Sequence, residues 1–336
     1  MNYEDLMLRV IKKANQFKYT TKPNPVVGAI IFKANKVISE GYHEMYGGNH
    51  AEINAIEEAQ KYQGKKFQDF SELTLLCTLE PCSHIGKTGS CAEFIVQAGF
   101  KNIIIGAIDP NPKVSGRGIE ILRNNKINVE VGLCEDLVEK QNKFFFYKHK
   151  NNKPYITVKI ASSLDGKSHY NNNEKILITT ESSRNDVQLI RAKYDAILTG
   201  GNTLRNDNPQ MNARVDFSVN QAKKILLTQK PFDKNLNFFK NASVDVFEIT
   251  NLIDIINSYQ KSEICSILVE SGPRLVNAFL KEGIVDELII YTSKKELGKE
   301  GINWFDKDNA VESYGFKLES TYKINTDTKE IFIKDE

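Results

Sequence analysis

The chain alternates between continuous apolar runs and stretches in which apolar residues recur every three or four positions. Residues 1–17 show the second pattern, from Tyr3 to Phe17, which predicts an amphipathic helix. Residues 26–32, VVGAIIF, form a continuous apolar run of the kind found in a strand that is buried on both faces. The helical period returns from about His50 onward. Strands and helices are therefore expected to alternate.

The same alternation continues through the first half of the chain. LTLLCT at residues 73–78 and NIIIGAI at residues 102–108 are typical of buried strands, and a helix is expected from about Cys91 to Gly99. Strands that alternate with helices in this way are typical of an α/β layered domain.

A second series of strands and helices follows a polar segment. KHKNNKP at residues 148–154 is rich in charge and ends in Pro, which is typical of a boundary between domains. Helices are expected near residues 182–193 and 273–282. The expected strands are YITVKIA, AILTG, KKILLT, SILVE and ELIIYT. The sequence thus predicts two α/β domains, residues 1–147 and 148–336.

The net charge and the length of the apolar runs indicate which kinds of partner and which compartment to expect. The 45 Lys and Arg residues against 43 Asp and Glu give a net charge of +2, so bulk charge does not recruit a polyanion. No apolar run approaches the roughly 18 residues that a membrane span needs, and the first helix does not have the pattern of a signal peptide. We expect a cytoplasmic protein without a membrane or nucleic-acid partner. In that reducing compartment, clustered cysteines favour metal ligation or catalysis over disulfides.

Three side chains in the first half form a zinc-ligand set. His50, Cys82 and Cys91 offer one imidazole and two thiolates, which is a tetrahedral set that lacks its fourth protein ligand. A catalytic zinc keeps such an open position for water. Glu52 follows His50 by two residues and can carry protons to and from a substrate nitrogen. The alternative is that His84 is a fourth ligand, which would make the zinc structural.

The motifs around these residues carry a family resemblance. Zinc deaminases combine H-x-E with P-C-x-x-C, and the Glu is their general acid/base. Here HAE and PC are present, but eight residues separate the two cysteines. With TKPNPVVGAI upstream, HAE and TLEPCSHIGKTGSC resemble the deaminase domain of the bifunctional riboflavin-biosynthesis deaminase/reductase family. The loop closes on Gly-Ser-Cys where that family usually has Pro-Pro-Cys. The resemblance implies that Asn24 contacts the pyrimidine.

Three loops in the second half follow predicted strands. They lie in VKIASSLDGK, LTGGNTLRNDNPQMNAR and VESGPRLVNAFL. Ligands of open α/β sheets collect beyond the carboxyl ends of the strands, so these loops can meet over one cleft. In the third loop, Gly272 and Pro273 open a helix whose free backbone N–H groups make an anion site suited to a pyrophosphate.

In order and spacing these loops resemble the reductase half of the same family, so that the resemblance covers nearly the whole chain. It implies two domains: an N-terminal cytidine-deaminase-like α/β/α layered domain that binds Zn²⁺, and a C-terminal dihydrofolate-reductase-like α/β domain that binds NADPH. By position, the residues implied to face NADPH are Ala161, Thr203, Asp207, Gly272, Pro273, Arg274, Leu275, Val276, Asn277 and Ala278. Those implied to face the ribosyl-phosphate substrate are Lys175, Arg191, Met211, Arg214 and Glu270.

Two positions depart from the family. Lys175 stands where the family has a Ser that meets the substrate, and Leu177 stands where it has a Trp that meets the cofactor. Lys175 could still bind a phosphate, and Leu177 could still cover a nicotinamide face. The guanidinium pair of Arg191 and Arg214 suits a phosphate because each group presents a planar fork of donors.

The expected activity is a two-step reaction of riboflavin biosynthesis. Zinc-dependent hydrolytic deamination of a diaminopyrimidinone ribosyl phosphate, with Glu52 protonating the leaving nitrogen, precedes NADPH-dependent reduction of the ribosyl group to a ribityl chain. Asp207 is the candidate for positioning near the reductive step. The expected partners are this small-molecule pyrimidine ribosyl phosphate and further copies of the chain, in a dimer or tetramer.

Two other functions use the same residues. A nucleic-acid deaminase such as a tRNA editor would share the zinc set, but it predicts a basic groove and a short cysteine spacing. A non-catalytic protein that keeps zinc only for folding would have no use for Glu52.

Overall fold

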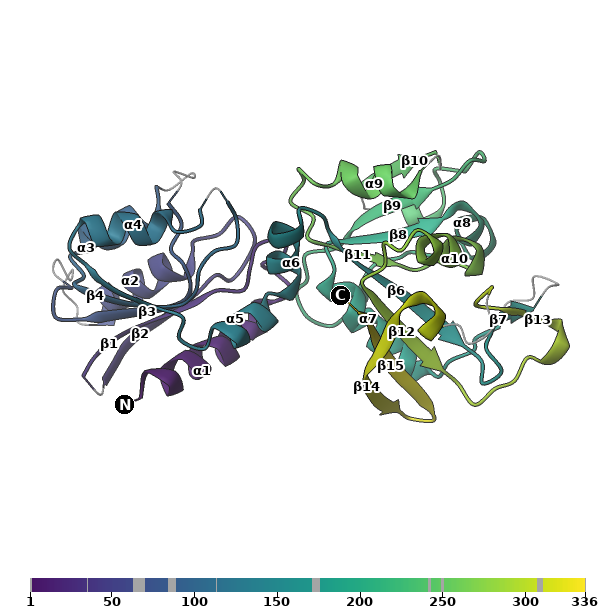
Figure 1. Ribbon diagram of the computed structural model, residues 1–336, viewed down its shortest axis with the longest axis horizontal. Helices are drawn as coiled ribbons and strands as arrows, with labels where there is room; N and C mark the ends of the chain where they lie inside the picture. Colours follow the sequence, from purple (N-terminus) through teal and green to yellow (C-terminus); the bar gives the residue numbers. More distant parts are fainter. Residues whose placement is uncertain are drawn as a thin grey trace. The chain divides into compact units, whose positions relative to one another are not determined.

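The computed structural model describes residues 2–34, 36–62, 70–83, 89–112, 114–170, 176–240, 243–248, 251–306 and 311–335. It divides into two compact units, Met1–Asn152 and Lys153–Glu336, and each has a sheet of its own (Figure 1). None of the helices in the described ranges is long and apolar enough to cross a membrane. The two-domain α/β architecture expected from the sequence is confirmed.

The first unit is built on a five-stranded sheet with the order β2-β1-β3-β4-β5. β1 pairs antiparallel with β2 and β3, whereas β3, β4 and β5 run parallel. The strands are β1 (Gly28–Lys33), β2 (Lys36–Tyr42), β3 (Thr74–Leu79), β4 (Asn102–Ala107) and β5 (Asn128–Val131). The parallel strands direct their carboxyl ends to one edge of the sheet, where the loop after β3 begins.

Helices cover both faces of this sheet because successive strand residues point to opposite sides. In β1, Ala29 and Ile31 pack in one core cluster with α2, α3 and α4, whereas Ile30 and Phe32 pack with α1 in another. The helices are α1 (Tyr3–Ala14), α2 (Ala51–Tyr62), α3 (Cys91–Ala98), α4 (Arg117–Asn124), α5 (Glu135–Gln141) and α6 (Lys143–Asn151). The result is the α/β/α layering expected from the sequence.

The segment predicted as a polar boundary is mostly helical. α6 continues through residues 148–151 because the preceding aromatic run supplies an apolar face, and Phe146 packs against Leu79, Ala107 and Val138. The helix ends at Asn152, whose left-handed backbone conformation caps it. The division between the units therefore falls after Asn152, later than the predicted boundary at residue 148.

The second unit contains an eight-stranded sheet with the order β10-β9-β8-β11-β6-β12-β15-β14. The six strands from β10 to β12 are parallel, and the hairpin of β14 and β15 adds two antiparallel strands at one edge. The strands are β6 (Tyr155–Ser162), β8 (Ala196–Gly200), β9 (Lys223–Leu227), β10 (Val244–Phe247), β11 (Ser266–Val269), β12 (Glu287–Thr292), β14 (Phe316–Ile324) and β15 (Asp327–Lys334). A separate two-stranded sheet joins β7 (Lys167–Tyr170) and β13 (Gly301–Asn303).

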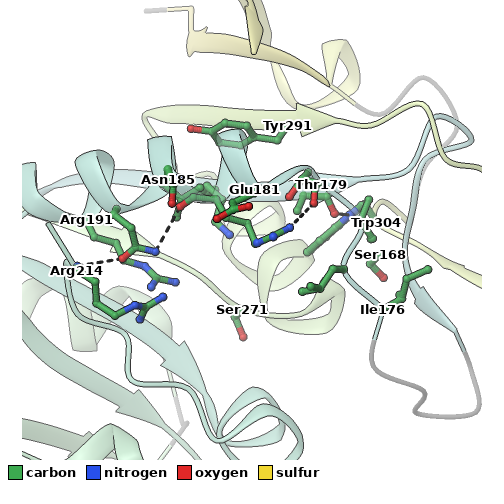
Figure 2. Close-up of a pocket in the computed structure, with 17 residues that line it drawn as sticks. Ser168, Ile176, Thr179, Glu181, Asn185, Arg191, Arg214, Ser271, Tyr291 and Trp304 are labelled. Carbon is green, nitrogen blue, oxygen red and sulfur yellow. Dashed lines mark hydrogen bonds between the residues drawn. The ribbon is translucent and has the colours of Figure 1, made fainter. Parts of the chain in front are cut away.

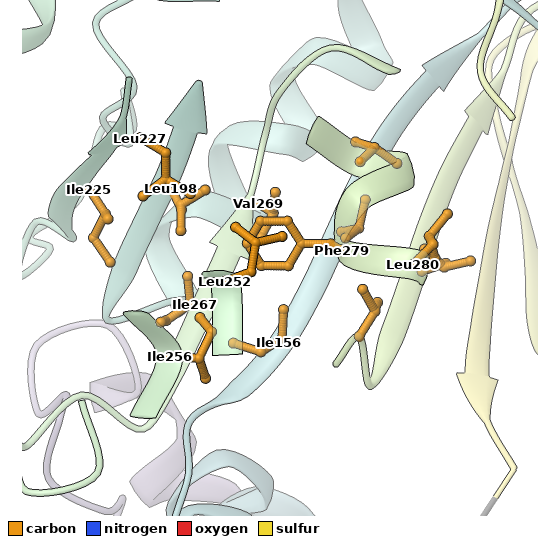
Figure 3. Packing of buried hydrophobic residues seen from close by; sticks show 14 of the residues in the cluster. Ile156, Leu198, Ile225, Leu227, Leu252, Ile256, Ile267, Val269, Phe279 and Leu280 are labelled. Atoms are coloured by element: carbon orange, nitrogen blue, oxygen red, sulfur yellow. The ribbon is translucent and has the colours of Figure 1, made fainter. Parts of the chain in front are cut away.

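One face of the large sheet carries the main hydrophobic core of this unit. The strand residues that pack there include Ile156, Leu198, Ile225 and Ile267. Phe279, from a helix on the same side, packs against them (Figure 3). The helices of the unit are α7 (Glu181–Lys193), α8 (Gly201–Asp207), α9 (Leu252–Ser258) and α10 (Pro273–Lys281). The predicted helices near residues 182–193 and 273–282 are confirmed.

The C-terminal hairpin fixes the start of α7. Asp327, 1% exposed, accepts hydrogen bonds from Thr180 N at 2.7 Å, Thr180 Oγ1 at 2.7 Å and Ser183 Oγ at 2.6 Å. Thr180 is the N-cap of α7, and a carboxylate at a helix N-terminus is favoured by the helix dipole. The last strands of the chain thus hold the first turn of a helix far earlier in the sequence.

Candidate active sites

Three potential metal ligands of the first unit come together. The ligand atoms of His50, Cys82 and Cys91 all lie within 4.8 Å of one another. His50 Nδ1 lies 3.5 Å from Cys82 Sγ and 3.2 Å from Cys91 Sγ. In a tetrahedral zinc site, bonds of about 2.0 to 2.3 Å place neighbouring nitrogen and sulfur ligands roughly 3.6 Å apart. The donor set and its spacing therefore fit a zinc ion.

Local structure brings these ligands together. His50 directly precedes α2, and Cys91 is the first residue of α3, so both lie at helix N-termini. Ser90 caps α3, with its Oγ accepting a hydrogen bond from Glu93 N at 3.1 Å. Cys82 follows Pro81 just beyond the end of β3, and the Cys91 N–H donates to Cys82 Sγ at 3.4 Å. A helix N-terminus favours a thiolate, because its partial charge is positive.

Glu52 lies inside this cluster, in the first turn of α2. Its side chain is buried, and Cys91 hydrogen-bonds to it. Burial, the largest influence, raises the pKa of Glu52 to about 7. A carboxyl group in this environment can hold a proton near neutral pH, which is what a general acid/base requires.

A histidine that the sequence analysis did not assign stands beside this group. His43 Nε2 lies 3.2 Å from Asn24 Nδ2, and His43 Nδ1 lies 3.0 Å from Asn49 O. Burial lowers the pKa of His43, so a neutral ring that donates from Nδ1 and accepts at Nε2 satisfies both contacts. The ring also meets that of His50, with centroids 5.6 Å apart. His43 belongs to no motif of fixed spacing, so nothing in the sequence marked it.

Glu80, two residues before Cys82, holds a neighbouring loop with its carboxylate. Oε2 accepts from Asp109 N at 3.2 Å and Gly116 N at 3.0 Å. Oε1 accepts from Gly118 N at 2.9 Å and Ile119 N at 3.2 Å. Glu80 thereby joins the start of α4 to the segment that carries a metal ligand.

Replacing Glu80 by Gln is expected to destabilise the first unit by about 2 kcal/mol, because the amide NH₂ would face backbone donors that the carboxylate now satisfies. Urea unfolding followed by circular dichroism would measure the change. Glu120→Gln, at an exposed position of α4, is the matched control and should unfold like the wild-type protein. An unchanged midpoint for Glu80→Gln would contradict this account.

The second unit contains a cavity of about 540 Å³ beyond the carboxyl ends of its strands. Arg191 and Arg214 line one end, and Trp304 and Ile176 line the other together with Ser168 (Figure 2). Arg184 also lines the cavity, and its Nη1 donates to Thr179 O at 2.6 Å. The helix α7 contributes residues at a helical period to the lining, from Glu181 to Arg191. The complete lining is Lys159, Ala161, Ser168, Ile176, Leu177, Ile178, Thr179, Glu181, Arg184, Asn185, Val187, Gln188, Arg191, Arg214, Ser271, Tyr291 and Trp304.

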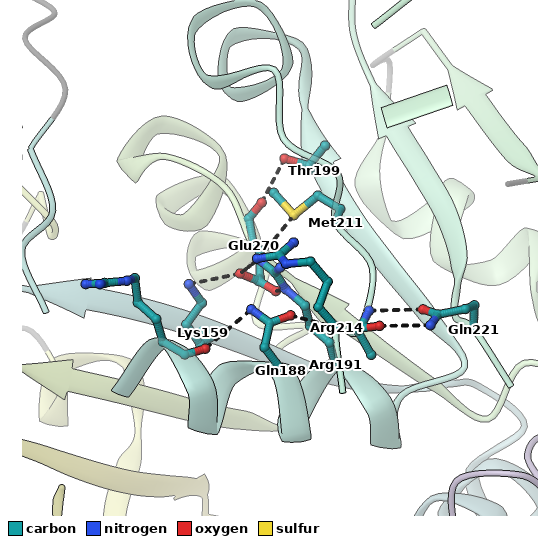
Figure 4. Close-up of polar contacts among 10 residues, drawn as sticks. Lys159, Gln188, Arg191, Thr199, Met211, Arg214, Gln221 and Glu270 are labelled. Carbon is teal, nitrogen blue, oxygen red and sulfur yellow. Dashed lines mark hydrogen bonds and ion pairs between the residues drawn. The ribbon is translucent and has the colours of Figure 1, made fainter. Parts of the chain in front are cut away.

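A buried carboxylate organises the cationic end. Glu270 Oε1 accepts from Arg191 Nε at 2.6 Å, and its Oε2 accepts from Arg191 Nη2 at 2.9 Å (Figure 4). Lys159 Nζ lies 2.9 Å from the same Oε2. Burial would raise the pKa of Glu270, but the charges of Arg191 and Lys159 outweigh it and hold the pKa well below its ordinary value. Glu270 is therefore an ionised carboxylate beneath the cavity.

Arg214 adds a second guanidinium to this end. Its backbone N–H donates to Gln188 Oε1 at 3.1 Å, and Figure 4 shows its side chain beside Arg191. Burial and then the charge of Arg191 lower the pKa of Arg214. An anion bound here would offset the repulsion between the two guanidinium groups, so this end of the cavity suits a phosphate.

The structure places some of the other predicted contacts near the cavity. Ala161 lines it, and Thr203 lies beside it, with Oγ1 3.4 Å from Ser271 Oγ. Gly272 is the N-cap of α10, and Pro273 is its first residue, as expected. Arg274 is exposed, and Leu275 and Ala278 are partly buried against the core. Lys175 and His84 lie outside the described residues.

Four residues with predicted contacts do not line this cavity, and their roles toward cofactor and substrate stay predictions. Val276 is fully buried in the core, and the Asn277 side chain donates to Pro273 O and Trp304 O, because only one face of α10 can point outward. Asp207 is exposed at the end of α8 and does not line the cavity. Met211 is buried, and its sulfur accepts a hydrogen bond from Arg191.

Most of the cavity wall was missed because α7 resembles a solvent-exposed helix in sequence. Glu181, Arg184, Asn185 and Gln188 are polar, and a polar face predicts contact with water as readily as with a ligand. The signal that could have found most of them is their spacing from Arg191: Gln188, Arg184 and Glu181 precede it by three, seven and ten positions and so share its helix face.

Comparison with known proteins identifies both units. The family described as "RibD C-terminal domain" matches residues 154–329. The family described as "Cytidine and deoxycytidylate deaminase zinc-binding region" matches residues 1–107.

Full-length relatives match across both units. The riboflavin biosynthesis protein RibD of Aquifex aeolicus is 34% identical over 90% of this chain and 88% of its own length. The RibD protein of Escherichia coli is 32% identical over 89% of this chain and 90% of its own. Among solved structures, Acinetobacter baumannii RibD superposes with a TM-score of 0.89 at 33% identity and covers 99% of each chain. The Thermotoga maritima deaminase/reductase gives a TM-score of 0.84 at 30% identity, also with 99% of each chain covered. The chain therefore belongs to the RibD family of bifunctional deaminase/reductases in riboflavin biosynthesis.

Proposed function

We propose that the first unit deaminates a diaminopyrimidinone ribosyl phosphate by hydrolysis and that the second unit reduces the ribosyl group of the product with NADPH. The observation that carries this proposal is the joint presence of a three-ligand zinc set with a buried carboxylate in one unit and a phosphate-suited cavity in the other. The full-length relatives support it, because they match both units of this chain. They also count against the alternative of a tRNA deaminase with an accessory domain.

In the first unit, His50, Cys82 and Cys91 would hold zinc and leave one position for a non-protein ligand. When bound, the ion supplies a Lewis acid that makes water a nucleophile at neutral pH. Glu52 takes the proton that this water loses and returns it to the amino group that departs as ammonia. Because the amide nitrogen of Asn24 meets His43, its amide oxygen is the group that would accept a hydrogen bond from the pyrimidine.

In the second unit, Arg191 and Arg214 would bind the phosphate of the substrate. Glu270 holds Arg191 in place by two hydrogen bonds, so that the guanidinium is fixed before the substrate arrives. At the start of α10, the backbone N–H groups of Gly272, Arg274 and Leu275 would bind the cofactor pyrophosphate, while Pro273, which has no N–H, fixes the first turn. Ala161 lines the cavity, and Thr203 lies next to it through Ser271. When bound there, NADPH would supply the hydride that reduces the carbon of the opened ribosyl group, and a proton would complete the ribityl hydroxyl.

Incubating the purified protein with the diaminopyrimidinone ribosyl phosphate would test both halves. Without NADPH, the expected product has lost one amino group and gained one oxygen; with NADPH, that product has also gained two hydrogens. Mass spectrometry of the products separates these outcomes. Chelating the metal should abolish the first step and leave the reduction of pre-deaminated substrate intact. Unchanged substrate in the presence of zinc would contradict the proposal.

We also propose that the protein works in the cytoplasm as a homodimer or homotetramer. The five cysteines are free, and the two thiol ligands, Cys82 and Cys91, must stay reduced to bind a metal, which suits a reducing compartment. Light scattering of the purified chain would give the number of subunits.

A further inference from the structure

The single tryptophan of the chain lies in the wall of the cavity of the second unit. Trp304 follows β13 directly and is only 6% exposed. Trp304 belongs to the hydrophobic core cluster that includes Phe279, and it also lines the cavity. Trp304 is therefore both a core residue and a part of the binding surface.

Hydrogen bonds fix this residue at three points. The indole Nε1–H donates to Ala161 O at 2.8 Å, at the carboxyl end of β6. The Trp304 carbonyl accepts from Asn277 Nδ2 of α10 at 2.7 Å. Its backbone N–H donates to Gly166 O at 3.1 Å. The orientation of the ring is thus set before any ligand binds, so the ring need not be ordered at the moment of binding.

The cavity has two chemically different ends. Figure 2 shows Trp304 with Ser168 and Ile176 at one end, whereas Arg191 and Arg214 lie at the other. Leu177, which is 65% exposed, also lines the cavity. An anion fits the guanidinium end, and a planar ring fits the end that has an aromatic and two aliphatic side chains.

We infer that Trp304 is the aromatic surface against which the nicotinamide ring of the cofactor packs. The two elements to which its indole and carbonyl are bonded, the end of β6 and α10, are those that the proposed function assigns to the cofactor. The substrate phosphate occupies the opposite end, which leaves the aromatic end for the ring that delivers hydride. This inference rests on the proposed reductase function and adds a specific binding residue to it.

Because the chain has one tryptophan, the tryptophan fluorescence of the protein reports only on the surroundings of Trp304 in the cavity wall. Titrating the wild-type protein with NADPH should quench the tryptophan emission and sensitise that of NADPH. Ribose 5-phosphate, a probe for the guanidinium end, should leave the emission nearly unchanged. Quenching by ribose 5-phosphate but not by NADPH would overturn the inference, because the ring end would then belong to the substrate.

Substitutions at Trp304 and Phe279 distinguish a contact with the nicotinamide ring from a contribution to core packing. Trp304→Leu should weaken NADPH binding about tenfold, as measured by calorimetry, because an aromatic contact is lost. Trp304→Phe should restore most of the affinity. Phe279→Leu is the matched control: it removes an aromatic ring from the same core cluster without touching the cavity, and it should lower the melting temperature but keep the NADPH affinity.

The outcomes distinguish this inference from the proposed function. If the wild-type protein binds NADPH and reduces its substrate, but Trp304→Leu binds NADPH equally well, only the role of Trp304 is wrong. The same holds if Phe279→Leu loses as much NADPH affinity as Trp304→Leu. If Trp304→Leu does not fold, the role of Trp304 is tested instead by the quenching of the wild-type tryptophan emission by NADPH and by the NADPH affinity of Trp304→Phe. A wild-type protein that binds no NADPH would overturn the reductase function itself.

Discussion

Replacing Glu52 by Gln is expected to lower the rate of deamination by about 10²- to 10⁴-fold and to leave the metal content unchanged. The amide has nearly the shape of the carboxyl group but cannot take or give a proton, so the general acid/base contribution is lost. The metal should stay bound because Glu52 is no member of the ligand set of His50, Cys82 and Cys91. Product analysis gives the rate, and metal analysis of the dialysed protein gives the zinc content.

Two further measurements make this test specific. Glu52→Gln should still reduce pre-deaminated substrate with NADPH, since that reaction takes place in the other unit. Glu57→Gln, at an exposed position of the same helix, should deaminate at the wild-type rate. Normal deamination by Glu52→Gln would contradict the assigned role, and loss of zinc in this variant would mean that Glu52 supports the metal rather than the proton transfer.

Replacing Glu270 by Gln is expected to destabilise the second unit by about 3 kcal/mol and to lower the rate of reduction by at least about 100-fold. The neutral amide would leave Arg191 and Lys159 buried without the charge that pairs with them. Freed from its partner, Arg191 would no longer be held for the phosphate, so the KM for the substrate should rise more than that for NADPH. Thermal unfolding and steady-state kinetics measure these effects, with exposed Glu282→Gln as the control.

The pH dependence of the same variant gives an independent check. The pKa of Glu270 lies below its ordinary value of 4.5, because Arg191 and Lys159 outweigh the effect of burial. A carboxyl group whose pKa is depressed in the folded state contributes stability that is fully present above its unfolded pKa and is lost as the pH falls. The stability difference between wild type and Glu270→Gln should therefore be constant near pH 7 and shrink below about pH 4.5. A difference that grows as the pH falls would contradict the ion-pair account.

The metal ligands could be predicted from the sequence because the motif is local. His50 and Glu52 flank a helix start, and Cys82 follows a strand that ends at a proline, so short segments fix most of the geometry. His43 and Glu80 could not be assigned in this way. His43 follows β2 and meets Asn24, which precedes β1, because the antiparallel pairing of the two strands brings these ends together. Glu80 binds backbone groups before and within the start of α4, which only the folded chain brings near.

In the second unit, the buried parallel strands were predictable and the edges of the sheet were not. β8, β11 and β12 are continuous apolar runs, which is the pattern of strands buried on both faces. β14 is no continuous apolar run: Phe316, Leu318, Tyr322 and Ile324 alternate with polar residues, and most of the strand is exposed, so the pattern of a buried strand does not predict it. For Val276 and Asn277, the position in the family predicts the helix, but packing decides which face of that helix turns inward, and both side chains are buried.

The bonds from Thr180 and Ser183 to Asp327 have a consequence for how the chain is made. A nascent chain that has emerged only as far as α10 already contains every predicted loop of the reductive cavity, yet it lacks the carboxylate that secures the first turn of α7. The zinc ligands, in contrast, are all translated within the first third of the message. During synthesis from the N-terminus, the complete set of metal ligands is therefore present long before Asp327, the residue that secures the first turn of α7 in the second unit.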